Sequence, residues 1–136
     1  MTKPKPPRAG KACSAGAGGT IIAWEDRRSG TIPDIYAQRI TAAGVAVWTA
    51  NGVALSSTGT QLNPTVLADG ASGAYVAWNQ SGEIYLTRVT GAGAVAAGWP
   101  AFGLLVSDGS TSATANRASL VEDGAGGAFV VWESTG

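Results

Sequence analysis

Short apolar runs separated by polar, glycine-rich turns follow one another along the chain, and no segment keeps the i, i+3, i+4 spacing of a helix. Each run is rich in Val, Ile, Leu, Tyr or Trp and is bounded by Gly, Asp, Asn or Ser, which is typical of β-strands. Tight-turn signals at Asp69-Gly70 and Ser81-Gly82 join neighbouring runs as hairpins. In the best-defined stretch the pattern predicts four antiparallel strands, at residues 64–67, 74–78, 83–90 and 103–107.

The same pattern recurs with a period of 54 residues. A glycine-rich turn followed by an apolar strand that ends in tryptophan occurs three times, at Trp24, Trp78 and Trp132. A fixed period of this size indicates copies of one supersecondary unit, each too small to bury its own apolar face. The units lie near residues 16–69, 70–123 and 124–136.

The strand at residues 20–24 is apolar on both faces, which predicts a sheet that is covered on both sides. A four-stranded sheet of this kind, repeated along the chain, is typical of a β-propeller blade, and a β-solenoid is the alternative. We therefore predict an all-β fold of about two and a half propeller blades, each with four antiparallel strands. Counting unit by unit gives nine strands, because the first unit has no clear first strand and the last has only two. Blade faces then remain open at both ends, so we expect assembly with copies of the chain or with further blades of a longer protein.

A second signature lies in the third strand of the unit. Residues 34–40 and 83–89 share the order acid, Ile, Tyr, two variable residues, Arg and an aliphatic residue. Together with the Asp-Gly-x-Gly-Gly turn and the strand that ends in Trp, this resembles the repeats of secreted bacterial β-propeller proteins. The match runs from Gly16 to Trp132, although the second unit has Asn79 where the first has Glu25. The resemblance implies a propeller in a large extracellular protein, with no catalytic residue set.

Residues that recur in equivalent positions are expected to hold the fold together. The strand tryptophans should pack between blades, because each blade needs the same filler. An arginine on an otherwise apolar strand requires a carboxylate partner, which Asp69, Asp123, Asp34 or Glu83 could supply. The predicted structural residues are Trp24, Trp78, Trp132, Tyr36, Tyr85, Arg39 and Arg88.

The candidate ligand-binding residues lie in loops. Trp48 and Trp99 precede the fourth strand, where they could stack on sugar rings or cap the blade. Glu25, Asp26 and Asp34 crowd the first long loop, which makes Ca²⁺ a conceivable ligand, but Arg27 and Arg28 can neutralise these acids. The spacing does not match an EF-hand, so we expect no metal and no other cofactor. Residues 107–111 faintly resemble the Asp-box turn of sialidases, and an ordinary turn is the simpler interpretation.

Composition argues against several classes of function. The chain has no histidine and a single cysteine, so the usual general base and metal ligand are missing and we expect no enzyme activity. Lys3, Lys5, Arg8 and Lys11 precede a body that carries five basic and nine acidic residues, which disfavours nucleic-acid binding. No apolar run is long enough to insert into a membrane.

The first fifteen residues are expected to form a flexible, basic, proline-rich tail. Cys13 would then be a solvent-exposed free thiol, or alternatively a link between two chains. The low charge and the abundance of Gly, Ser, Thr and Ala favour an extracellular bacterial protein. The sequence as a whole predicts a non-enzymatic extracellular scaffold, or an interaction and adhesion module. The alternative is a lectin-like propeller that binds carbohydrate through its loop tryptophans.

Overall fold

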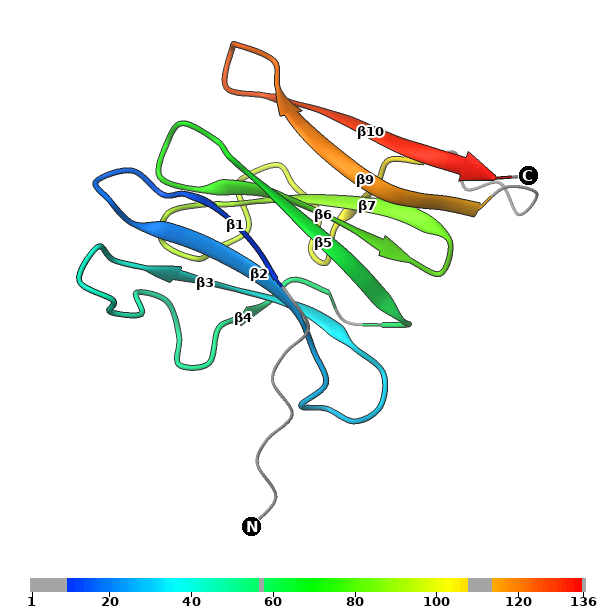
Figure 1. Cartoon of the computed structure of the whole chain (residues 1–136), viewed down its shortest axis with the longest axis horizontal. Coiled ribbons are helices and arrows are strands. Elements are labelled where there is room, and N and C mark those ends of the chain that lie inside the picture. The colour runs from blue at the N-terminus through cyan, green and yellow to red at the C-terminus, as the bar shows by residue number, and fades with distance from the viewer. Residues whose placement is uncertain (1–9, 57, 108–113, 136) are drawn as a thin grey trace.

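The structure is a computed structural model that describes residues 10–56, 58–107 and 114–135 of the 136-residue chain. Within these ranges the chain forms ten strands and no helix. The strands make three antiparallel sheets, which are layered in chain order (Figure 1). The prediction of an all-β, antiparallel fold is confirmed. None of the described residues belongs to a helix of the length and hydrophobicity needed to cross a bilayer.

Each sheet follows the chain without a crossover. The first sheet contains β1 (Lys11–Ser14), β2 (Thr20–Asp26), β3 (Asp34–Ile40) and β4 (Val53–Ala54). The second contains β5 (Gln61–Ala68), β6 (Ala74–Gln80), β7 (Glu83–Val89) and β8 (Leu104–Leu105). The third contains β9 (Thr114–Glu122) and β10 (Ala128–Thr135). The four strands predicted between residues 64 and 107 correspond to β5 through β8.

Strands β2, β6 and β10 each carry one of the repeated tryptophans. Each of them pairs with its neighbours in the same register. Trp24 of β2 lies opposite Tyr36 of β3, and Trp78 of β6 lies opposite Tyr85 of β7. In the third sheet Ala128 lies opposite Glu122, as Ala74 lies opposite Ala68 in the second. The 54-residue period of the sequence is therefore a period of strand pairing as well.

The strand count of nine is wrong, because the first sheet has a first strand. Lys11–Ser14 pairs antiparallel with Thr20–Ala23 of β2, so these residues do not belong to a flexible tail. Cys13 lies opposite Ile21, is half-buried and packs against the core, which replaces the predicted exposed thiol. Burial, and secondly the Asp69 carboxylate, raise the pKa of this thiol. Residues 1–9 of the predicted tail lie outside the described residues.

Two hydrophobic layers hold the three sheets together. Ile21 and Ala23 of β2 pack with Val76 and Trp78 of β6 between the first and second sheets. Tyr75 and Ala77, which alternate with these residues along β6, point to the opposite face of the sheet. They pack against the third sheet. The middle sheet is thus covered on both faces, which is why its strand β6 lacks the alternation of polar and apolar residues.

Candidate interaction surfaces

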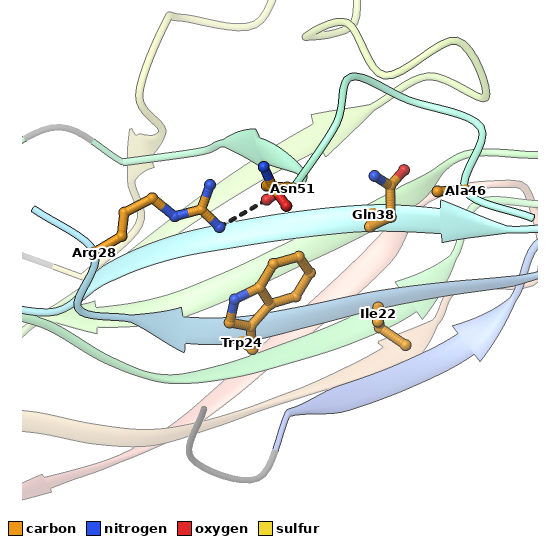
Figure 2. Close-up of a pocket in the computed structure, with 6 residues that line it drawn as sticks. All are labelled: Ile22, Trp24, Arg28, Gln38, Ala46 and Asn51. Atoms are coloured by element: carbon orange, nitrogen blue, oxygen red, sulfur yellow. Dashed lines mark hydrogen bonds between the residues drawn. The ribbon is translucent and has the colours of Figure 1, made fainter. Parts of the chain in front are cut away.

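The outer face of the first sheet carries an open hollow of about 390 Å³ (Figure 2). Ile22 and Trp24 reach it because alternate residues of β2 point to opposite faces of the sheet. Gln38 comes from β3, and Arg28 from the loop between β2 and β3. The complete lining is Ile22, Trp24, Arg28, Gln38, Ala46 and Asn51.

The matching tryptophan of the second sheet has quite different surroundings. Trp78 is 0% exposed, because the first sheet packs over it. Both indoles stack on the tyrosine of the next strand, with ring centroids 6.4 Å apart for Trp24 and Tyr36 and 6.2 Å apart for Trp78 and Tyr85. Trp24 is nevertheless half-exposed. The hollow therefore lies on a face of the first sheet whose counterpart in the second sheet, around Trp78, is covered by a neighbouring sheet.

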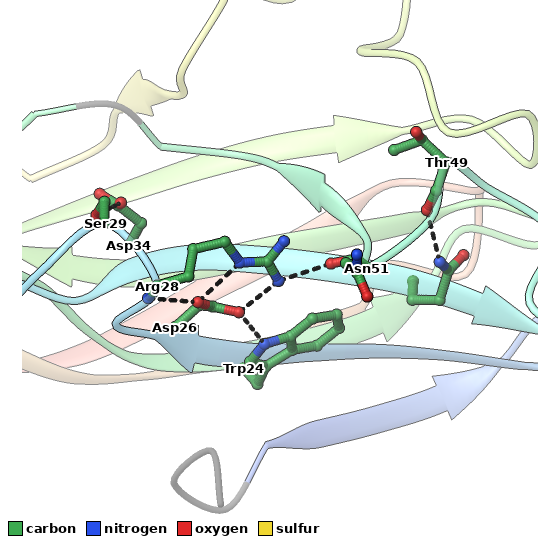
Figure 3. Close-up of polar contacts among 8 residues, drawn as sticks. Trp24, Asp26, Arg28, Ser29, Asp34, Thr49 and Asn51 are labelled. Atoms are coloured by element: carbon green, nitrogen blue, oxygen red, sulfur yellow. Dashed lines mark hydrogen bonds and ion pairs between the residues drawn. The ribbon is translucent and has the colours of Figure 1, made fainter. Parts of the chain in front are cut away.

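A bidentate ion pair lies at one end of the hollow (Figure 3). Arg28 donates from Nε to Asp26 Oδ1 at 2.9 Å and from Nη2 to Asp26 Oδ2 at 2.5 Å. The indole Nε1 of Trp24 donates to the same Oδ2, and the Arg28 guanidinium stands 3.9 Å from the centroid of the Tyr36 ring. The hydrogen bonds from Arg28 lower the pKa of Asp26 from its ordinary 3.8 to about 2.

The side chains of Gln38 and Arg28 at the hollow are bonded within the chain. The side-chain amide of Gln38 donates to the Thr49 carbonyl, and its oxygen accepts from the backbone N–H groups of Arg39 and Trp48. Arg28 also donates to the carbonyl of Asn51. The surface that remains for an external partner is consequently mostly the apolar surface of Ile22, Trp24 and Ala46.

The outer face of the third sheet is the second open surface. Phe129 and Val131 of β10 are 62% and 59% exposed. The corresponding residues of the second sheet, 54 positions earlier, are Tyr75 at 6% and Ala77 at 0%, and the third sheet covers them. Neighbouring sheets pack on each other twice inside the molecule. The open face of the first sheet therefore corresponds to one side of this contact, and the open face of the third sheet corresponds to the other side.

The three acids of the first long loop do not converge on one point. Asp26 bonds Arg28 on the outer face, whereas Glu25 is buried on the inner face, where its Oε1 accepts from the backbone N–H of Asn63 at 2.9 Å. Asp34 accepts from the hydroxyl of Ser29. Among the described residues there is no group of three or more Asp, Glu, His or Cys side chains that could hold a metal ion.

The loop tryptophans lie between sheets rather than in open loops. Trp48 is buried, and its Nε1 donates at 2.9 Å to the carbonyl of Gly91, in the turn that follows β7 of the second sheet. Trp99 is half-buried and packs edge-on against Tyr75, with ring centroids 6.0 Å apart. Trp48 therefore offers no free ring face of the kind a sugar platform needs, and Tyr75 and the layer around it cover part of Trp99. Of the Asp-box stretch, only Ser107 lies within the described residues.

The two recurring arginines have different partners. Arg88 donates from Nε to Asp69 Oδ2 at 3.0 Å, which is the internal ion pair that the sequence suggested. Arg39 instead donates to the carbonyl of Gly91. The reason is that Ala15 stands in the first unit where the second and third have Asp69 and Asp123.

Sequence reasoning anticipated open faces at both ends but did not identify their residues. It treated Trp24 as equivalent to Trp78, and it did not single out Ile22, Phe129 or Val131. The available signal was the repeat itself, because an end unit exposes whatever the middle unit buries. No protein-family model, no curated protein and no solved structure matches this chain.

Proposed function

We propose that the chain is a stretch of β-propeller that acts as a non-enzymatic, extracellular interaction module. In this interpretation the first and second sheets are complete four-stranded blades, and β9 and β10 are the first two strands of a third. The sheet order, the layering of the sheets and the resemblance of the repeats support the assignment. The absence of histidine from the sequence and the raised pKa of the Cys13 thiol support a role without catalysis.

One observation carries this proposal: the residue positions that are open at the two ends are closed in the middle. Ile22 and Trp24 correspond to Val76 and Trp78, which another sheet covers, and Phe129 and Val131 correspond to the covered Tyr75 and Ala77. The end faces therefore have the composition of packing surfaces rather than of solvated ones. A blade from a second copy, or a further blade of a longer chain, would bury them in the same way.

Contact between these two faces would be heterologous, because each copy contributes a different surface. Such contacts form a ring if the rotation between copies closes, and a fibre if it does not. The chain would thereby serve as a scaffold or an adhesive unit whose association is built into its repeat.

Carbohydrate binding through the loop tryptophans is the weaker candidate. Trp48 is buried, Trp99 packs against Tyr75, and the side chains of Gln38 and Arg28 at the Trp24 hollow already bond within the chain. A sugar needs free donors and acceptors as well as an aromatic platform, whereas an apolar blade face does not.

Analytical ultracentrifugation of the whole chain tests the proposal. We expect the sedimentation coefficient to rise with protein concentration and the rise to disappear in Val131→Asp, which places a charge on the outer face of the third sheet. The matched control is Val95→Asp, an exposed valine that forms a β-bridge with Val89 at the end of β7, and it should associate like the wild type. Circular dichroism checks that all three proteins are folded.

A wild-type chain that stays monomeric from micromolar to near-millimolar concentration would overturn the proposal. Saturable binding of a soluble oligosaccharide that is lost in Trp99→Ala, with no self-association, would support the carbohydrate alternative instead.

A further inference from the structure

The arginine of β3 lacks the carboxylate that its counterpart in β7 has. Arg88 donates from Nε to Asp69 Oδ2 at 3.0 Å, and the Asp69 side chain is only 3% exposed. Arg39 occupies the same position in β3, but Ala15 stands where the second unit has Asp69. Arg39 Nη1 donates to the carbonyl of Gly91, and among the described residues its other N–H groups make no hydrogen bond or ion pair. A half-buried guanidinium is thus left without a negative partner in this sheet.

The carboxylate of the second unit also holds the turn between the first two strands of its sheet. Asp69 Oδ1 accepts from the backbone N–H groups of Ala71 and Gly73 at 2.8 and 2.9 Å. The third unit repeats these two bonds to Asp123 Oδ1 at 2.7 and 2.9 Å. One carboxylate therefore satisfies two backbone donors of the turn, and in the second unit it neutralises the arginine as well.

The turn of the first unit has adapted to the missing carboxylate. The N–H of Gly19 donates to the Gly16 carbonyl at 2.9 Å, and the N–H of Ala17 makes no hydrogen bond within the described part of the chain. Ala17 has a φ of 49°, in the left-handed region that residues other than glycine rarely adopt, whereas Ala71 and Ala125 have no positive φ. The first turn is consequently the strained member of the three.

The frame of the turn is otherwise unchanged. The N–H of Ala15 donates to the Gly19 carbonyl at 2.9 Å, as the N–H of Asp69 donates to the Gly73 carbonyl at 3.1 Å. Residues 16–18 are exposed, and their outer surface is open to solvent. Ala15 itself is 1% exposed, because the rearranged turn and its neighbours close around it. A change of conformation at Ala17 alone would give the first turn the shape of the second.

We propose that the first unit binds a small carboxylate ion in the place that the Asp69 carboxyl group fills in the second unit. Arg39 supplies the charged donor, and the N–H groups of Ala17 and Gly19 supply the two backbone donors. The ion enters as the turn takes the conformation of residues 70–73, which releases Ala17 from its left-handed φ. Binding thus selects the unstrained form of the turn.

The arrangement of donors selects a carboxylate rather than a spherical anion. In the second unit one oxygen of the carboxylate accepts from both backbone N–H groups, and the other oxygen accepts from the guanidinium. An ion with two oxygens on one carbon reproduces both contacts, whereas chloride has a single centre. Formate is the smallest ion of this kind, and it replaces the group by which aspartate exceeds the Ala15 side chain.

Titration of the chain with sodium formate tests the proposal, with sodium chloride at the same ionic strength as the reference. The chain carries Val131→Asp, so that self-association does not interfere. We expect the amide resonances of Ala17 and Gly19 in NMR spectra to shift saturably with formate but not with chloride. The melting temperature should rise by about 4 °C at a formate concentration about ten times the dissociation constant.

Two variants remove the site in opposite ways. Arg39→Gln removes the charged donor, and Ala15→Asp supplies the carboxylate within the chain, so both should abolish the response to formate. Ala15→Asp should also raise the melting temperature in the absence of formate. The matched control is Arg117→Gln, which removes an arginine whose side chain is 79% exposed and pairs with Glu133, and it should leave the response unchanged. No saturable shift in the parent chain, or a shift that persists in either folded variant, overturns the proposal.

Discussion

The middle sheet and the two outer sheets are built from the same repeat but experience different environments. Trp78 and Trp24 occupy the same strand position, stack on the same type of tyrosine and donate to a side-chain oxygen two residues later, yet only Trp78 is fully buried. The repeat sequence determines how each strand pairs, whereas the neighbouring sheet determines whether its faces are covered. Surfaces available for interaction therefore lie at the ends of the array.

Truncating the two tryptophans should give the largest contrast. Trp78→Ala removes a fully buried ring from the layer between two sheets and should lower the free energy of unfolding by about 3–5 kcal/mol. Trp24→Ala should cost only about 1–2 kcal/mol, since half-exposed surface loses less transfer energy. Urea denaturation at low protein concentration, in the Val131→Asp background, measures both without interference from self-association. Equal costs would mean that the two sheets do not differ as described.

Adding one methyl group to equivalent turn glycines should give a smaller contrast. A Cβ at Gly73 would overlap the backbone carbonyl of Val89 in β7 and would come within 2.8 Å of Asp69 Oδ2. At Gly127 the overlap is with the Asp123 side chain, which can rotate away. We expect Gly73→Ala to destabilise by about 2 kcal/mol and Gly127→Ala by less than about 1 kcal/mol. Thermal unfolding of the two variants compares them directly, and a larger loss for Gly127→Ala would contradict this difference between the two turns.

The smallest effect should come from the acid titration of Asp26, whose position in the second sheet has no carboxylate. Asp26 has a folded pKa of about 2 against an ordinary 3.8, so its contribution to stability is complete above the ordinary value and is lost as pH falls toward 2. Since the Arg28 side chain is 38% exposed, the loss should not exceed about 1 kcal/mol. The second sheet has Gln80 in this position, which does not titrate.

The control for this effect is Arg28→Gln. Without the guanidinium, the pKa of Asp26 should return toward its ordinary value, and the part of the acid destabilisation that depends on Asp26 should shrink. Urea midpoints of the two proteins, measured at pH values on either side of 3.8, give the comparison. An unchanged pH dependence in Arg28→Gln would show that the ion pair does not stabilise this end of the molecule.

Strand content could be predicted from the sequence because it depends on local patterns. Apolar runs bounded by turn residues located β5 through β8, and the Trp and Tyr positions that recur in the sequence lie opposite each other in both four-stranded sheets. β1 was missed because Lys-Ala-Cys-Ser is short, polar at both ends and preceded by prolines. Its strand conformation comes from pairing with β2, which no local pattern reveals.

The candidate site was harder to predict, because exposure depends on distant segments. Trp48 was a reasonable sugar platform as part of its own loop, but its indole bonds Gly91, which is 43 residues away in the turn after β7 of the next sheet. Conversely, Trp24 was grouped with Trp78 because their local sequences match. Only the arrangement of the sheets distinguishes the ring that is covered from the ring that is open.

The most direct test of the central claim, that the two end faces bind each other, uses a pair of complementary variants. Ile22→Asp alters the outer face of the first sheet, and Val131→Asp alters the outer face of the third. Each variant alone should sediment as a monomer, whereas an equimolar mixture should form a one-to-one dimer that does not grow further, because each partner keeps one intact face. A mixture that stays monomeric, or single variants that associate like the wild-type chain, would contradict the account.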